Sequence, residues 1–172
     1  MSNTWNEACM ETLERVFQQA NTTPRVDTTH GAYEAVSDGL ASYVRTRDGR
    51  SDHEAVELMR HAAAMSLHSL MDLLEEGPFG MVGELHNLLC RKQHDYGHKN
   101  ITNFGLVGVA VRMCDKIARL INIERRGGHA ALAGEPLIDA YRDIVGYAVI
   151  AIMLYTGTFE LELDTHAIQG DA

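Results

Sequence analysis

Residues 137–155 read LIDAYRDIVGYAVIAIMLY, and this stretch decides the fold class. Its charged side chains end at Asp143, and the 12 residues from Ile144 to Tyr155 carry none. A helix that is apolar on every face must be buried, either in a core or between chains. The run is shorter than the roughly 18 apolar residues that a membrane span requires. We therefore expect a buried helix that other helices cover, with a homodimer interface as a further cover.

Apolar residues recur at a spacing close to 3.6 along almost the whole chain, without strand alternation. The three prolines stand where such patterns begin or end, and Ser51 with Glu54 forms a capping-box signature. The sequence therefore predicts an all-α helical bundle. The predicted helices cover residues 3–20, 29–45, 51–76, 81–93, 106–126 and 137–155.

The length of 172 residues predicts a single globular unit. We expect residues 1–76 to form N-terminal helices that pack on a core formed by residues 77–158. Residues 159–172 are expected to form a loose acidic tail. Two successive glycines, Gly127 and Gly128, predict a flexible loop over residues 127–136.

Composition limits the function classes. The chain has 24 acidic and 15 basic residues and a formal charge of −9, which argues against stable binding to duplex nucleic acid. Its three cysteines are widely spaced in apolar helical patterns, so a disulfide framework is not expected. With neither a signal-peptide pattern nor a membrane span in the sequence, we expect a cytoplasmic protein without a membrane partner.

Residues 91–105, RKQHDYGHKNITNFG, are unusually varied for a connection between helices. They offer cations for phosphates, above all Lys99, amides for a sugar or base at Asn100 and Asn103, and the ring of Tyr96. We predict a binding loop over residues 94–103 that becomes ordered when a ligand binds. The alternative is a loop that its own side chains hold in place.

Two predicted helices carry charge on one side. Arg112, Lys116 and Arg119 share a stripe with Asp115, a pattern that suits a polyanionic ligand but equally forms a solvated ion-pair ladder. On the last helix, Asp139 and Asp143 are one turn apart and can reach a common Mg²⁺. Their alternative role is to pair with Arg142 and the cations of the preceding helix.

The dipeptide His94-Asp95 also suggests the metal-dependent HD phosphohydrolases, which need a preceding histidine and a later aspartate as well. Downstream candidates for the aspartate are Asp115, Asp139 and Asp143. Upstream candidates are His53, His61 and His68. However, Tyr96-Gly97 ends the helix directly after the pair. We therefore expect each upstream histidine to be a partly buried, hydrogen-bonded residue.

Four ordered motifs between residues 81 and 157 resemble the first nucleotide-modification-associated domain family of phage proteins, whose relatives are often labelled MazG-like. They are Lys92-x-x-Asp95-Tyr96-Gly97, Asn103-Phe104, Arg112-x-x-Asp115-Lys116-x-x-Arg119-Leu120 and Asp139-x-x-x-Asp143-x-x-x-Tyr147. MazG-like proteins and dimeric dUTPases are all-α nucleoside triphosphate pyrophosphohydrolases, which hold Mg²⁺ with Glu-x-x-Glu and Glu-x-x-Asp motifs. Neither motif occurs within residues 81–157.

The resemblance implies a MazG/dUTPase-like core with extra N-terminal helices and a Mg²⁺-dependent pyrophosphohydrolase, with Mn²⁺ as a second possible metal. The expected metal ligands are Asp115, Asp139 and Asp143, and the expected general base is His94 or Asp95. The expected substrate-binding residues are Tyr96, Lys99, Asn100, Asn103, Arg112, Lys116 and Arg119. One alternative is a non-catalytic nucleotide-binding or assembly protein on the same scaffold, and the HD phosphohydrolase is another.

Overall fold

The computed structural model describes residues 2–22, 30–46, 51–74, 78–127 and 137–166, and these residues fold as helices without a strand. The predicted all-α class is confirmed. The helices are α1 (Trp5–Thr22), α2 (His30–Thr46), α3 (Asp52–Leu74), α4 (Pro78–Tyr96), α5 (Lys99–Thr102), α6 (Gly105–Arg125) and α7 (Leu137–Thr156). None of these helices combines the length and hydropathy needed to cross a bilayer.

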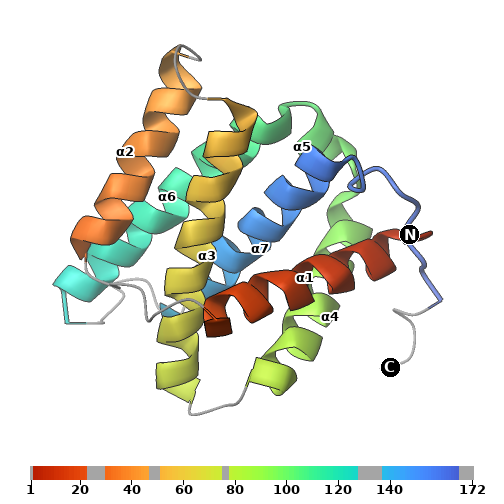
Figure 1. The fold of residues 1–172 in the computed structure, drawn as a ribbon, viewed down its shortest axis with the longest axis horizontal. Coiled ribbons are helices and arrows are strands. Elements are labelled where there is room, and N and C mark those ends of the chain that lie inside the picture. Colours follow the sequence, from red (N-terminus) through yellow and green to blue (C-terminus); the bar gives the residue numbers. More distant parts are fainter. Residues whose placement is uncertain (1, 23–29, 47–50, 75–77, 128–136, 167–172) are drawn as a thin grey trace.

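Helix α7 is the centre of the fold, as its apolar sequence predicts. It packs against α3, α6 and α1. Helix α2 covers the outer side of α3 and α6, and α1 also contacts α4 (Figure 1). Val145, Ala148, Val149 and Met153 are fully buried. The expectation that other helices bury this stretch is confirmed, and the chain itself supplies most of the cover.

The capping box predicted at the start of α3 is present. The Ser51 N–H donates to Glu54 Oε2 at 2.6 Å, and the Glu54 N–H donates to Ser51 Oγ at 3.3 Å. This reciprocal pair satisfies two backbone donors that the helix itself leaves unpaired. The predicted helix ends are correct within a few residues where the residues are described. Of the flexible loop predicted over residues 127–136, all but Gly127 lies outside the described residues.

The predicted binding loop over 94–103 is mostly helical, so this part of the prediction is wrong. Helix α4 continues to Tyr96, and α5 adds a further turn. Gly97 (φ +65°) and Gly105 (φ +55°) take the left-handed conformation that favours glycine, which lets the chain change direction on both sides of α5. The buried side chain of Ile101 anchors that turn in the core. The polar side chains therefore extend mostly from helical turns.

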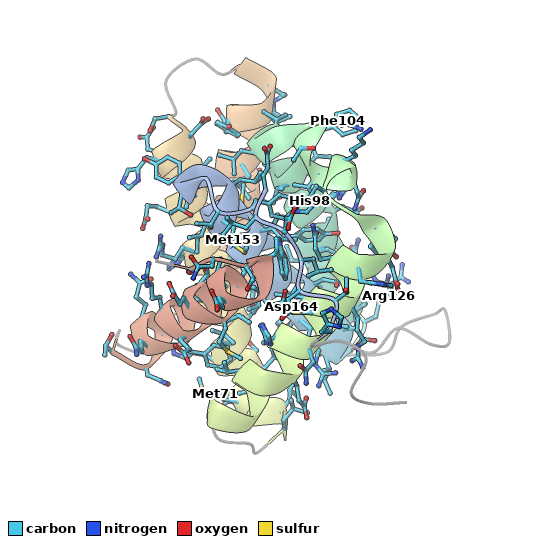
Figure 2. The ribbon with its side chains drawn as sticks, turned by 90° about the vertical axis from the view of Figure 1, so that its right-hand side faces the viewer. Met71, His98, Phe104, Arg126, Met153 and Asp164 are labelled. Carbon is cyan, nitrogen blue, oxygen red and sulfur yellow. The ribbon has the colours of Figure 1, made fainter. Side chains whose placement is uncertain are left out.

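The expectation of a loose tail is wrong for residues 158–166, which pass the N-terminal end of α1 and pack against it (Figure 2). The Phe159 ring is 1 % exposed. The Trp5 N–H donates to the Glu162 carbonyl oxygen at 2.8 Å, and the side chain of Asn6 exchanges two hydrogen bonds with the Asp164 backbone. These contacts hold the C-terminal segment 158–166 against the first turn of α1.

Candidate functional site

A pocket with a cavity volume of about 70 Å³ is lined by residues of α1, α4, α5, α6 and α7. Three of the lining side chains are cationic, and the only carboxylate among them is Asp143. Tyr96 lies at the solvent side of the pocket, since its side chain is 66 % exposed. The polar and aromatic lining is formed by Trp5, Lys92, Gln93, Tyr96, Asn100, Arg112, Arg142, Asp143 and Tyr147.

Asp143 is held between two lysines from different helices. Lys92 Nζ lies 2.6 Å from its Oδ1, and Lys116 Nζ lies 2.9 Å from its Oδ2. Burial alone raises the pKa of Asp143, but the hydrogen bonds and charges of both lysines outweigh burial and lower it. Burial likewise lowers the pKa of Lys116, and the bond to Asp143 reverses that shift and raises it. Both groups therefore stay charged near neutral pH.

The two arginines of the pocket have different partners. Arg112 Nη2 donates to the backbone oxygen of Asn100 at 3.1 Å and to its Oδ1 at 2.8 Å. Arg142 Nη2 lies 3.0 Å from Glu84 Oε2, and its Nη1 lies 3.9 Å from Asp139 Oδ1. Within the described residues Arg112 has no carboxylate at ion-pair distance. Its charge is therefore the least compensated of the cations in the lining.

Two further lining side chains carry buried donors without a partner. Trp5 is 1 % exposed and Gln93 is 7 % exposed. Trp5 Nε1 and Gln93 Nε2 form no hydrogen bond in the described structure. Leaving a buried N–H unpaired costs about 1–3 kcal/mol, so such groups are rare and call for an explanation.

The structure brings part of the predicted site together. Tyr96, Asn100, Arg112 and Asp143 line the pocket, and Lys116 adjoins it through Asp143. Asp139 and Arg119 are half-buried but outside the lining. The predicted residues that lie outside the lining with exposed side chains are His94, Asp95, Lys99, Asn103 and Asp115.

The proposed Mg²⁺ ligands do not form a suitable donor set. Each oxygen of Asp143 already accepts from a lysine, Asp139 lies near Arg142, and Asp115 is on the exposed side of α6. Among the described residues there is no group of three histidine, cysteine or acidic side chains that could hold a metal ion. Ion pairing, the alternative role of the two α7 aspartates, is what the structure contains.

The histidines of the HD interpretation are also separate from the pocket. His68 is buried, and its Nε2 lies 3.0 Å from the Ala20 carbonyl oxygen, as expected for a hydrogen-bonded core histidine. The same expectation is wrong for His53 and His61, which are exposed. His94 Nδ1 lies 3.2 Å from Asp95 Oδ1, and both side chains are mostly in solvent.

Sequence reasoning missed Trp5 and Gln93 and gave Arg142 only a pairing role. Gln93 had a detectable signal, because it follows Leu85 and Leu89 at intervals of four on the buried face of α4. An amide at that position breaks the apolar pattern. Trp5 had no local signal, since it reaches the pocket from the other end of the chain.

Comparisons of the chain with protein-family models, curated proteins and solved structures find no match.

Proposed function

We propose that this chain binds a phosphate-bearing small molecule of the nucleotide class in the cation-lined pocket. The observation that carries the proposal is the excess of cations there. Lys92, Arg112 and Arg142 line the pocket with one carboxylate, in a chain of formal charge −9. Forked arginine donors and lysine point charges are the groups that recognise phosphate.

The dimensions of the pocket favour the same ligand class. A cavity of about 70 Å³ suits a phosphate-sized group rather than a whole nucleotide. The remainder of the ligand would lie at the mouth, where the exposed ring of Tyr96 offers a stacking surface. Five residues of the family motifs, Lys92, Tyr96, Arg112, Asp143 and Tyr147, line this one pocket, which supports the proposed resemblance.

Binding is better supported than hydrolysis. A general base must accept a proton near neutral pH, and the lowered pKa of Asp143 makes it a weak base. The general bases proposed from the sequence, His94 and Asp95, lie outside the pocket lining. The non-catalytic alternative therefore has more support than the Mg²⁺-dependent pyrophosphohydrolase, which stays a prediction together with its metal.

Titration calorimetry with a panel of nucleotides, with and without Mg²⁺ or Mn²⁺, tests the proposal. Arg112→Gln should weaken binding at least about ten-fold, since a charged hydrogen bond is lost. The matched control is Arg91→Gln, because Arg91 is exposed on α4 and outside the pocket lining. Equal losses in both variants would show unspecific attraction. Release of pyrophosphate in the presence of metal would restore the hydrolytic interpretation.

The cytoplasmic location and the homodimer are further proposals. Because other helices of the same chain cover α7, we expect a dimer interface, if the chain forms one, on another surface. Phe104 is 70 % exposed and projects from the molecule, and Val111 on α6 is 50 % exposed (Figure 2). Light scattering of the wild-type chain and of Phe104→Ser at high concentration measures whether that surface joins two copies.

A further inference from the structure

Trp5 and Gln93 carry donors for which the described residues supply no acceptor. An indole N–H can only donate, and an amide nitrogen also only donates. Both atoms are buried, and no protein atom among the described residues accepts from them. Both side chains line the pocket, which makes a molecule bound there a candidate acceptor for them.

The C-terminal segment 158–166 keeps Trp5 in this position. The Trp5 backbone N–H donates to the Glu162 carbonyl oxygen. The rings of Trp5 and Phe159 pack edge to face. The His98 ring makes a second edge contact with Phe159, with a centroid distance of 5.7 Å. The indole therefore cannot turn outward to find a partner in solvent.

We propose that Trp5 and Gln93 determine specificity by donating to an uncharged oxygen of the ligand, a carbonyl or hydroxyl, while its phosphate lies at Arg112. This inference rests on the proposed function of the pocket. Neutral N–H donors do not compensate a second buried anion, whereas a neutral acceptor satisfies them without adding charge. The preferred ligand is thus a phosphate monoester with a polar organic part, not an inorganic polyphosphate.

The experiment compares pyrophosphate with the common deoxynucleoside monophosphates by titration calorimetry on wild type, Trp5→Phe, Gln93→Met and Arg91→Gln. We expect at least one monophosphate to bind wild type more tightly than pyrophosphate does. That advantage should fall about three- to ten-fold in Trp5→Phe and Gln93→Met, the range of one ordinary hydrogen bond. Pyrophosphate affinity should fall less than monophosphate affinity in both variants, and Arg91→Gln should behave as wild type. Trp5 is the only tryptophan of the chain, so its fluorescence reports binding independently.

Stability separates this role from a structural one. Gln93→Met keeps the volume and removes an unpartnered amide, so its melting temperature should hold or rise while monophosphate affinity falls. A monophosphate advantage that persists in Gln93→Met overturns the inference even if Trp5→Phe fails to fold. Pyrophosphate binding as tightly as every monophosphate overturns it too, while leaving the phosphate pocket in place. If no probe binds wild type, the inference and the proposed function both fail.

Discussion

The ring of Phe159 packs edge-on against the indole of Trp5, with centroids 6.3 Å apart and an interplanar angle of 74°. This contact joins the last described segment of the chain to its first helix. Because Trp5 also lines the pocket, the C-terminal segment is one contact away from the candidate ligand site. The segment is therefore a part of the fold that supports the pocket.

Phe159→Ala should lower the free energy of unfolding by about 3 kcal/mol or more, the usual cost of truncating a buried phenylalanine. For a chain of this size that corresponds to roughly 6–12 °C in melting temperature. Thermal melts followed by circular dichroism measure the loss. Glu160→Ala, one position along and exposed, is the matched control and should melt as wild type does. Equal melting of both variants would mean that the segment does not pack as described.

Asp143→Asn should destabilise the protein in metal-free buffer. The change removes the charge that Lys92 and Lys116 share, and both ammonium groups lose their counter-charge. Lys92 is 43 % exposed, so solvent weakens its part, whereas Lys116 is 21 % exposed. We expect a loss of about 1–3 kcal/mol, measured by urea unfolding.

A metal-binding role of Asp143 predicts the opposite sign, because neutralising a carboxylate in an empty metal site relieves repulsion with Asp139. The control is Asp115→Asn, which changes an exposed carboxylate on α6 and should leave stability unchanged. A metal-free Asp143→Asn protein as stable as wild type would contradict the ion-pair interpretation and return support to the Mg²⁺ site.

Acid should remove the same contribution. The folded-state pKa of Asp143 lies below its ordinary value of 3.8, so the unfolded chain takes up the proton first as the pH falls. The stability that Asp143 provides is present above about pH 4 and is lost below it, through the folded-state pKa. Urea unfolding at pH 7 and pH 3.5 should therefore show a smaller difference between wild type and Asp143→Asn at the lower pH. A constant difference would contradict the lowered pKa.

The sequence predicts the burial of α7 because that property needs no knowledge of neighbours. A helix without a polar face exposes apolar side chains to water in every orientation, so its composition alone predicts that it is buried. The helical face that meets a partner is harder to predict. Asp115 and Lys116 are adjacent and point about 100° apart, and only the packing of α6 on α7 places the lysine, and not the aspartate, beside Asp143.

Contacts between distant parts of the chain leave no local pattern. The hydrogen bonds between Asn6 and Asp164 join positions 158 residues apart, and neither neighbourhood predicts the other. The acidic composition after Gly157 therefore predicts a loose tail, although Phe159 is buried in the core and anchors the segment together with those hydrogen bonds. For the same reason the sequence did not place Trp5 at the site.

Alkaline pH should destabilise the protein through Tyr33. Burial, the largest cause, raises the pKa of Tyr33 to about 12 from an ordinary value of 10, even though hydrogen bonds from Ser66 and Ser69 act in the opposite direction. Between these values the unfolded chain releases the phenolic proton and the folded chain keeps it, so unfolding becomes more favourable as the pH rises above 10. Tyr33→Phe should show a weaker dependence, because burial also raises the pKa values of Tyr141 and Cys90 and their part remains. The change should cost about 1 kcal/mol near neutral pH for the hydroxyl bond to Ser66 at 3.2 Å. Chemical unfolding at pH 8, 10 and 11 measures both effects, with Tyr96→Phe as the exposed control. Parallel pH profiles for wild type and Tyr33→Phe would contradict the raised pKa and the burial that causes it.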